Sequence, residues 1–398
     1  MRAPVHGVVQ GEAERAALLN VIDKQWYTHS VYTAEFEKLI RQYIGVRHAA
    51  FCNSGSSANL LALSTLADYE IPEERRIMPG DEVITTAISF VTTVAPIVQV
   101  GAIPVFIDMR PDFTVDIDAI DAAIKPKTKA VVLTHTLGVP FDGRAVRDLC
   151  DRRKLWLIED SCDALGSSHS GRMCGAWGDL STLSFYPAHT ITAGEGGMVL
   201  TDDPKLARIV LSLRDWGRGC WCKPGEDNAC GHRFDNGYDH KHIHVRMGYN
   251  LKATDLQAAI GVAQMDRLPG FVVKRRENYQ YLYWKLCYGK RGLTTLPGGA
   301  VPFGFPIILH PDTDRAKMCR YLEAHGVGVR MIFGGMPDQH PAYKHITYRV
   351  SGELPNTKAF YERGIWVGCW PGLNMVHLNH IVNTIQEYDT CKKETLNL

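Results

Sequence analysis

The chain has 398 residues, of which 45% are hydrophobic and 22% are charged, and its 44 Lys and Arg residues nearly balance 43 Asp and Glu. Length and composition exclude collagen-like, disordered and coiled-coil proteins, and they indicate two domains or one large domain with an added lobe. The formal charge of +1 provides no basic surplus for a nucleic acid or an anionic membrane, so we expect neither as a partner.

Short apolar runs alternate with helical patterns through the first two hundred residues. Strands are predicted at 49–52, 82–86, 103–108, 129–134, 155–160, 181–185 and 196–200, and helices at 33–45, 56–67, 115–124 and 143–154. This alternation predicts an α/β protein with a doubly wound, mostly parallel sheet, whose ligands bind at the carboxyl ends of the strands. The segments expected to meet in one crevice there are 53–57, 88–90, 159–160 and 184–189.

The second half of the chain is less regular. The segment 220–244 has no apolar periodicity, which argues against an ordinary helix or strand. A long helical stretch begins at residue 253. The elements predicted after it are 303–309, 315–326 and 377–389. We therefore predict a large domain at 1–265 with a cysteine-rich insertion at 216–245, and a linking helix with a small C-terminal domain at 266–398.

Two features bear on the compartment of the protein. The most apolar long stretch, 90–107, contains Pro96, Gly101 and Pro104, so it is too short and too interrupted to span a bilayer. The first residues lack the apolar region of a signal peptide. We expect a cytoplasmic protein, in which the eleven cysteines stay reduced and are core, metal-binding or redox-active residues.

Three segments of the predicted crevice carry polar groups that suit a phosphorylated ligand. Asn53 to Ser57 follows a strand and opens a helix, so it offers backbone N–H groups and hydroxyls to an anion, although a simple N-cap in a tight turn has the same pattern. Asp160 ends an apolar strand, where a solvated turn residue is the alternative. The segment 184–197, SFYPAHTITAGEGG, adds a hydroxyl, two aromatic rings, a histidine and a glycine-rich turn.

Together these segments resemble the sugar aminotransferase-like branch of the fold-type I pyridoxal-phosphate enzymes, from about Trp26 to the C-terminus. The resemblance implies a large domain with a mostly parallel central sheet, a smaller C-terminal α+β domain, and a homodimer with shared active sites. The residues implied to hold the cofactor are Gly55, Ser56, Ser57 and Ser184 at its phosphate, Phe90 against its ring, Asp160 at its ring nitrogen, and Asn250 at the phosphate in the neighbouring subunit's site. A carboxylate at the ring nitrogen keeps it protonated, so the ring can accept electrons.

One position departs from the aminotransferases of this family. They carry a lysine that binds the cofactor covalently, whereas this chain has His189, in Tyr186-Pro-Ala-His189. An imidazole cannot form that bond, so we expect free pyridoxamine phosphate, with His189 as the base that removes a proton from its C4′ carbon. In these features the chain resembles the nucleotide-linked 4-keto-6-deoxyhexose 3-dehydratases, with which Tyr186 and Asp163 also agree. Phe305 is expected where the aminotransferases keep a histidine of the second domain.

Four cysteines form a further group, Cys162, Cys220, Cys222 and Cys230. Grouped thiolates suit tetrahedral zinc or an iron-sulfur cluster, and the residues alone leave both open, with buried unligated thiols as a third reading. The resemblance to the iron-sulfur members of the dehydratase subgroup implies a [2Fe-2S] cluster on these residues, and a flavin or iron-sulfur reductase as electron donor. The histidines at 240, 242 and 244 are expected in a loop or edge strand without metal.

The residues and the resemblance together predict a 3-dehydratase, dependent on pyridoxamine phosphate and [2Fe-2S], of a CDP- or dTDP-linked 4-keto-6-deoxyhexose in deoxysugar biosynthesis. After the C3 hydroxyl leaves, the reaction needs two electrons, which a one-electron centre can deliver singly. One alternative is a glutamate-coupled dehydratase of GDP-linked 4-keto-6-deoxymannose, of the kind that forms the colitose precursor. The other is a non-catalytic, zinc-stabilised protein that binds a sugar nucleotide.

Overall fold

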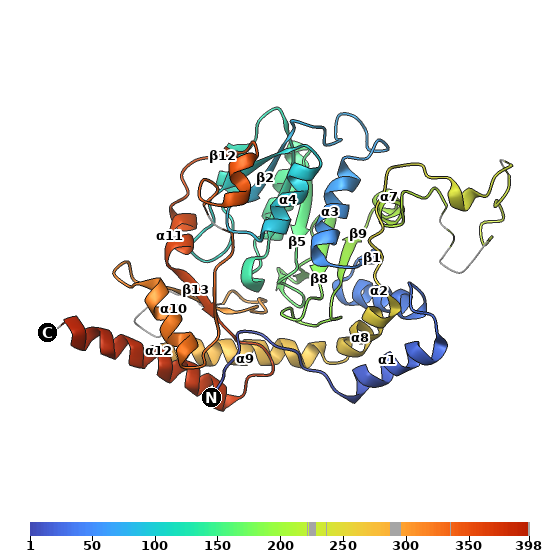
Figure 1. Cartoon of the computed structure of the whole chain (residues 1–398). Coiled ribbons are helices and arrows are strands. Elements are labelled where there is room, and N and C mark those ends of the chain that lie inside the picture. The colour runs from blue at the N-terminus through green and yellow to red at the C-terminus, as the bar shows by residue number, and fades with distance from the viewer. Residues whose placement is uncertain (221, 223–227, 236, 287–295, 335, 397–398) are drawn as a thin grey trace.

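The computed structural model describes residues 1–220, 222, 228–235, 237–286, 296–334 and 336–396 of the chain. Within these residues, one large sheet is covered by helices, and a smaller sheet lies beside it (Figure 1). The long helix α9, Leu268–Leu286, runs along the base of the view in Figure 1. The molecule is thus an α/β protein with a large sheet domain and a smaller C-terminal α+β domain.

The large sheet positions the predicted ligand-binding edge. Its strands are β1 (His48–Cys52), β2 (Glu82–Thr86), β3 (Ile103–Ile107), β4 (Thr128–Thr134), β5 (Trp156–Asp160), β8 (Leu180–Ser184), β9 (Gly197–Thr201) and β12 (Arg349–Val350), in the order β1-β9-β8-β5-β4-β2-β3-β12. Neighbours from β8 to β12 pair in parallel, whereas β9 is antiparallel to both β8 and β1. The carboxyl ends of β2, β4, β5 and β8 therefore share one edge of the sheet.

The helices are mostly of three turns, as the periodic pattern indicates. Besides α9 they are α1 (Glu12–Lys24), α2 (Val31–Ile44), α3 (Gly55–Leu66), α4 (Val91–Gln99), α5 (Ile117–Ala123), α6 (Gly143–Arg153), α7 (Pro204–Arg214), α8 (Asp255–Met265), α10 (Arg315–Ala324), α11 (Pro355–Arg363) and α12 (Met375–Leu396). Short 3-10 turns span Thr136–Gly138, His240–His242 and Pro341–His345, and a hairpin joins β6 (Ser168–His169) to β7 (Arg172–Met173).

Both faces of the large sheet are covered because successive strand residues point to opposite sides. Val83 and Val132 belong to a core with α3 and α7 on one face. Their chain neighbours Ile84 and Val131 belong to a second core, with α5 and α6, on the other face. The strands are therefore nearly continuous apolar runs, which is the pattern that the sequence shows.

The smaller sheet contains β10 (Phe305–Ile308), β11 (Val329–Met331) and β13 (Gly364–Val367), in the antiparallel order β10-β13-β11. Its core includes Leu282 of α9, Leu322 of α10 and Ile381 of α12. The first residues of the chain also reach this layer, because Ala3 forms a parallel bridge with Val327. The start of the chain is thus built into its second half.

The seven strands predicted from the first two hundred residues are confirmed as β1 to β5, β8 and β9, and the four helices predicted among them as α2, α3, α5 and α6. Helices α1, α4, α7 and α11 and strands β11 to β13 were not among the predicted elements. The predicted domain boundary, between residues 265 and 266, lies between α8 and α9 and stays a prediction.

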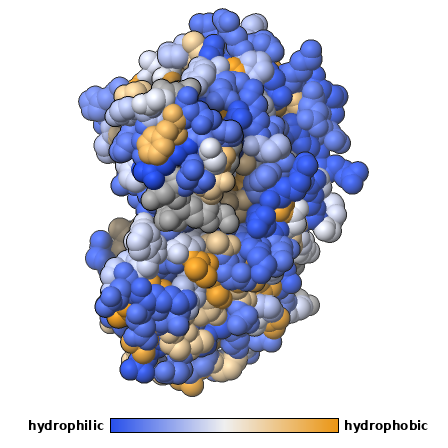
Figure 2. All heavy atoms as spheres, turned by 90° about the vertical axis from the view of Figure 1, so that its right-hand side faces the viewer, coloured by the Kyte–Doolittle hydropathy of each residue, from blue (hydrophilic) through white to orange (hydrophobic). Residues whose placement is uncertain are grey.

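No helix in the described part of the chain is both long and apolar enough to cross a membrane. The face seen in Figure 2 carries small groups of hydrophobic residues among mostly hydrophilic ones. Its polar surface is consistent with the balanced charge of the sequence.

Candidate active site

A cavity of about 1050 Å³ opens at the carboxyl ends of the parallel strands. Each of the four segments predicted to meet in one crevice contributes to its lining, so this prediction is confirmed. Among the lining residues are Asn53, Ser54, Gly55, Ser56, Ser57, Ser89, Phe90, Asp160, Cys162, Asp163, Ser184, Tyr186 and His189. The volume is that of a site for a cofactor together with a sugar-sized ligand.

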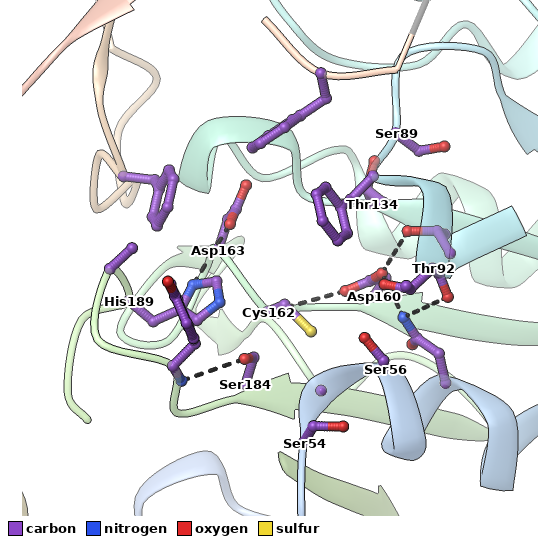
Figure 3. A pocket seen from close by; sticks show the side chains of 18 of the residues that line it. Ser54, Ser56, Ser89, Thr92, Thr134, Asp160, Cys162, Asp163, Ser184 and His189 are labelled. Atoms are coloured by element: carbon purple, nitrogen blue, oxygen red, sulfur yellow. Dashed lines mark hydrogen bonds and ion pairs between the residues drawn. The ribbon is translucent and has the colours of Figure 1, made fainter. Parts of the chain in front are cut away.

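The amino end of α3 forms one wall of the cavity. Ser54 caps the helix, and its Oγ accepts a hydrogen bond from the backbone N–H of Ser57 at 3.1 Å. Gly55 is needed for the close approach to β8, because an added Cβ would lie 2.6 Å from the Cβ of Ser184. Ser56 extends from this turn beneath the strand ends (Figure 3). The hydroxyls and N–H groups at the helix start fit the phosphate of a cofactor.

Gly55→Ala tests this fit. We expect the variant to bind pyridoxamine phosphate about tenfold more weakly, because the added methyl displaces Ser184 from the phosphate cradle. Binding is measured by titration of the cofactor's absorbance. Gly270→Ala on α9 is the matched control, since an added Cβ there meets no atom within 4 Å. Equal affinities of the two variants would show that the cradle does not hold the phosphate.

Asp160 ends β5 with its carboxylate held by three uncharged donors. Its Oδ2 accepts hydrogen bonds from the Asn59 amide at 2.9 Å and the Thr93 hydroxyl at 2.7 Å, and its Oδ1 accepts one from the Cys162 N–H at 3.2 Å. Neutral donors offset the cost of burying a full negative charge only in part. A protonated ring nitrogen against Asp160 would supply the balancing charge, so the residues present fit a pyridine cofactor.

Two aromatic rings line the mouth of the cavity and are accessible in this chain. Phe90 is 55% exposed and lies 6.2 Å, centroid to centroid, from Phe333 in an edge-to-face contact. Tyr186 is 46% exposed and lies 6.5 Å from the ring of His189. The exposed face of Phe90 suits its predicted role against the cofactor ring.

His189 lies beside Asp163 on the other side of the cavity (Figure 3). Its Nδ1 is 3.5 Å from Oδ1 of Asp163, which is too long for a good hydrogen bond, and Nδ1 has no hydrogen-bond partner among the described residues. The second carboxylate oxygen of Asp163 accepts the Leu137 N–H at 3.2 Å. Asp163 therefore has a fixed position from which it faces the imidazole.

Burial controls the charge of both groups. Burial, together with the nearby Arg275 and His6, lowers the pKa of His189 from 6.5 to about 3. Burial and the neighbouring Asp160 raise the pKa of Asp163 from 3.8 to about 8. At neutral pH the pair is thus an uncharged imidazole beside an uncharged carboxyl group, not an ion pair. An uncharged imidazole is able to accept a proton.

Arg275, on α9, fixes the backbone that carries His189. Its side chain is fully buried, and its guanidinium donates to the carbonyl oxygens of Ala188 at 3.1 Å and His189 at 2.9 Å. It also donates to the carbonyl oxygens of Pro302 at 3.2 Å and Phe303 at 2.9 Å. One cation thus joins the turn of His189 to the segment that enters the smaller sheet.

Phe305, expected where the aminotransferases keep a histidine, does not line the cavity, whereas Phe303 does. Phe305 belongs to β10 and packs inside the smaller domain, with its ring 4.8 Å from that of Tyr279. Phe303 precedes the strand, lines the cavity, and lies 5.2 Å from the ring of His189. Strand pairing of Phe305 with Val367 turns its side chain into the core, which explains the difference.

Asn250 is exposed and does not line the cavity of its own chain. It forms an antiparallel bridge with Asp215, and its Oδ1 accepts a hydrogen bond from the Lys252 amine at 2.8 Å. Its predicted contact with the cofactor of a neighbouring subunit stays a prediction.

Three of the four grouped cysteines lie together outside the cavity. Ligand atoms of Cys220, Cys222, Cys230 and His240 all lie within 4.8 Å of one another. The Nε2 of His240 is 3.2 Å from Cys220 Sγ, and its Nδ1 is 3.5 Å from Cys230 Sγ. Cys162, which the resemblance groups with these thiols, lines the cofactor cavity, and His240 lies with the other three cysteines. The four-cysteine ligand set stays a prediction.

The anchoring of the cysteine segment explains this arrangement. Bridges from Asp215 to Asn250 and from Arg218 to His244 fasten its two ends, and the segment extends away from the large sheet (Figure 1). Its thiols therefore meet a histidine of their own loop. His240, expected in a loop or edge strand without metal, lies in a 3-10 turn within ligand distance of two thiols.

Several functional contacts were missed at the sequence level. Asn59 and Thr93 orient Asp160, and their signal is a polar residue on an otherwise buried helix. Arg275 gives no local signal, because its four acceptors come from two distant segments. His6 and Arg330 also line the cavity, and neither belongs to a motif.

The arrangement of this sheet, with antiparallel β9 beside the parallel strands and a buried carboxylate at the end of β5, defines a fold-type I pyridoxal-phosphate enzyme. The chain belongs to the DegT/DnrJ/EryC1/StrS aminotransferase family, whose model matches residues 9–386.

Two of the similar proteins are named as 3-dehydratases of nucleotide-linked sugars. The chain is 43% identical to a lipopolysaccharide biosynthesis protein of Salmonella typhimurium, over 97% of this chain and 91% of that protein. It is 42% identical to the dTDP-4-dehydro-2,6-dideoxy-D-glucose 3-dehydratase of Saccharopolyspora spinosa, over 96% of this chain and 85% of that enzyme. The solved E. coli GDP-4-keto-6-deoxy-D-mannose-3-dehydratase with bound hydrated PLP is 26% identical, with a TM-score of 0.88, over 96% of this chain and 99% of that one.

Proposed function

We propose that the protein is a nucleotide-sugar 3-dehydratase that uses pyridoxamine phosphate to remove the C3 hydroxyl of a CDP- or dTDP-linked 4-keto-6-deoxyhexose. The observation that carries this proposal is the imidazole of His189 in the cavity, with its Nδ1 3.5 Å from the Asp163 carboxyl group. None of the described residues that line the cavity is a lysine, the residue on which covalent cofactor binding depends. The 42% sequence identity with a dTDP-sugar 3-dehydratase supports removal of the C3 hydroxyl as the reaction.

Each of these cavity side chains has a separate role in the proposed reaction. When bound, pyridoxamine phosphate supplies an amine for the C4 ketone and a ring that accepts electrons. Asp160 holds a proton on the ring nitrogen, and Phe90 covers one face of the ring. His189 takes the proton from the C4′ position. Asp163 lies beside the imidazole, and because its carboxyl group is uncharged it does not form an ion pair that would hold a proton on His189. Phe303 shields His189 from water.

The pKa of His189 predicts an unusual pH dependence. Because burial lowers this pKa to about 3, the imidazole stays unprotonated throughout the mildly acidic range. We therefore expect the rate of C4′ proton exchange to fall with acidification only below about pH 5, rather than near the ordinary histidine pKa of 6.5. Exchange of solvent deuterium into bound cofactor, followed from pH 4 to 8, measures it. A limb centred near 6.5 would show that the imidazole is solvated during the reaction.

We further propose that the cysteine segment supplies electrons through a [2Fe-2S] cluster that an external flavin or iron-sulfur reductase recharges. Three thiols and an imidazole form a ligand set that is suited to an iron-sulfur centre or to zinc. The reductive chemistry of the 3-dehydratase favours the cluster, since zinc has no redox function.

The position of Asn250 suggests how electrons pass from the cluster to a cofactor. Its backbone pairs with Asp215, at the base of the cysteine segment. We propose a homodimer in which Asn250 of one protomer reaches the cofactor phosphate of the other. The cysteine segment, which follows Asp215 in the chain, would then serve the cavity of the neighbouring protomer.

Anaerobic purification, iron, sulfide and zinc assays, and electron paramagnetic resonance with and without dithionite test the centre. Stoichiometric iron and sulfide with a reduced-state signal are expected. Zinc, or no metal after reconstitution, would overturn the redox role, and zinc without cofactor binding would indicate a non-catalytic protein. The His240→Ala variant is expected to lose the electron paramagnetic resonance signal of the cluster. If His240→Ala keeps this signal and Cys162→Ser loses it, the four cysteines are the ligands.

Activity is tested with reconstituted protein, pyridoxamine phosphate, an iron-sulfur flavin reductase, and the CDP- and dTDP-linked 4-keto-6-deoxyglucose substrates. Mass spectrometry is expected to detect a product that lacks the C3 oxygen. Absence of such a product with both substrates would overturn the proposal.

A glutamate-coupled dehydratase of GDP-4-keto-6-deoxymannose is the second candidate. The similarity of the whole fold to the E. coli enzyme of that name favours it. Turnover of the GDP-linked sugar that depends on glutamate and continues in iron-free protein would make it the function. The grouped thiols would then have no part in the reaction.

A further inference from the structure

A second buried carboxylate, Glu159, lies next to Asp160 on β5, and the proposed reaction does not use it. Its carboxylate accepts hydrogen bonds of 2.6 to 3.0 Å from the His135 imidazole, the Ser181 hydroxyl and the N–H groups of Gly175, Trp177 and Gly178. Burial acts to raise the pKa of Glu159, but these hydrogen bonds, that of His135 first, lower the pKa below its ordinary value. Glu159 is therefore a buried anion whose partners are all held in place.

Of these five donors, His135 alone also lines the cavity. Its Nδ1 accepts the backbone N–H of Phe141 at 3.3 Å, so the ring carries its proton on Nε2, which donates to Glu159 at 2.9 Å. The imidazole also stacks on the Phe141 ring, with the centroids 4.1 Å apart and an angle of 8° between the planes. These contacts fix both the tautomer and the plane of the His135 ring.

The turn that follows His135 has a left-handed backbone. Leu137 has a φ of 54°, which a bulky residue adopts only where its surroundings hold it. The next residue, Gly138, has a φ of 81°, and a Cβ there would collide with the carbonyl oxygen of a neighbouring segment. In this conformation Leu137 donates its N–H to Asp163 at 3.2 Å and accepts the N–H of Phe303 at 2.9 Å. The turn therefore connects two separate segments of the site.

Both segments end beside His189. Asp163 Oδ1 lies 3.5 Å from Nδ1 of the imidazole (Figure 3), and the ring of Phe303 lies 5.2 Å from the imidazole ring. Direct contacts thus lead from Glu159, through His135 and the turn at 135–138, to the surroundings of His189. Release of this turn would displace the Asp163 carboxyl group and let water reach the imidazole past Phe303.

We propose that Glu159 and His135 are positioning residues for His189, because their hydrogen bond fixes the turn at 135–138, which holds Asp163 and Phe303 beside the imidazole. The proposal rests on the proposed function, since it concerns the base of the same reaction. It assigns no chemical step to either residue. Neighbouring residues of β5 then have separate roles, with Asp160 at the cofactor and Glu159 behind the catalytic histidine.

The test compares His135→Asn with His135→Gln. An asparagine amide still accepts the Phe141 N–H but is too short to reach Glu159, whereas a glutamine amide reaches Glu159 with an N–H donor. We expect C4′ exchange on bound pyridoxamine phosphate at pH 7 to fall about 30-fold in His135→Asn and about threefold in His135→Gln, since a small displacement of reacting groups has a large effect on rate.

Nitrogen-15 NMR of the histidine-labelled full chain, with pyridoxamine phosphate present, gives a second result that does not depend on turnover. The His189 and His135 signals are identified by their loss in His189→Asn and His135→Gln. We expect His189 to stay unprotonated from pH 5 to 8 in the wild type and in His135→Gln, and to take up a proton in this range in His135→Asn, as water reaches it. Wild-type His135 should carry its proton on Nε2.

The variants leave in place the ionisable groups that face His189. These are Asp163 from the segment after β5, Tyr186 from its own turn, Arg275 from α9 and His6 from the first residues of the chain. A change in the protonation of His189 would therefore report the position of its surroundings and the access of water.

Arg349→Met is the control for a general loss of stability. It removes an ion pair with Glu82, of 2.7 and 2.9 Å, at the amino end of β2, away from the cavity. We expect it to unfold at lower urea than the wild type while His189 stays unprotonated from pH 5 to 8. Protonation of His189 in this control would overturn the proposal, because the effect in His135→Asn would then not be local.

The remaining outcomes separate this proposal from the proposed function. Slower exchange and a protonated His189 in His135→Asn, with recovery in His135→Gln, support the positioning role. An unprotonated His189 in His135→Asn, or equal effects of both variants, would overturn it. A wild-type His135 with its proton on Nδ1 would overturn it without any variant. Absence of C4′ exchange in the wild type would contradict the proposed function instead, and the NMR spectra would still decide the role of His135.

Discussion

His189→Asn is expected to reduce C4′ proton exchange on bound pyridoxamine phosphate about 10³-fold, the usual size of a general acid-base contribution. Asparagine retains a polar side chain of similar reach but cannot accept a proton at neutral pH. The backbone around it is held by Arg275, so the cavity should keep its shape. The measurement is the rate of solvent deuterium incorporation at C4′, with cofactor binding followed by absorbance in the same samples.

The control for this variant is His345→Asn, which changes an exposed histidine outside the cavity. It should exchange at the wild-type rate. If His189→Asn retains exchange within about threefold while binding cofactor normally, another group is the base. Tyr186, whose ring lies 6.5 Å from that of His189, would be the next residue to substitute.

Arg275→Met is expected to lower the free energy of unfolding by about 3 kcal/mol, because it leaves buried carbonyl oxygens without their donor. Methionine fills much of the same volume, so the loss reports the hydrogen bonds more than a cavity. Urea unfolding measures the change. Weakened C4′ exchange should accompany it at low urea, since the turn of His189 loses its anchor.

Arg276→Met is the matched control, one residue along the same helix. Arg276 also donates to backbone carbonyls, of Ala300 at 2.9 Å and Gly299 at 3.1 Å, but it is exposed. Its loss should cost less than about 1 kcal/mol, because water replaces the lost partner. Similar losses in the free energy of unfolding for both variants would mean that the buried hydrogen bonds of Arg275 contribute no more than the exposed ones of Arg276.

The sequence predicts the sheet well because burial on both faces makes each strand a continuous apolar run. The residues that follow these runs are therefore predictable as a group. Asp160 and the helix start at Gly55 were both placed correctly in the cavity for this reason. Parallel strands bring their carboxyl ends together whatever the details of the loops.

Contacts that depend on tertiary structure were harder to predict from the sequence. Phe303 and Phe305 have the same sequence environment, and only the pairing of β10 with β13 decides that the second is in the core. Cys162 lines the cavity, whereas the other three cysteines lie with His240 in a segment that is anchored at Asp215. Their common role as ligands stays a prediction. Spacing along a chain does not specify the direction in which a loop leaves the fold.

The parallel bridge between Ala3 and Val327 also has a consequence for how the protein is made. The first residues leave the ribosome long before their partner strand exists, and closing so long a loop is slow and entropically costly. The large sheet can assemble during synthesis, whereas the N-terminal strand must wait until the second half emerges. The contacts of the first residues with the smaller sheet therefore form after the strands β1 to β9 have been made.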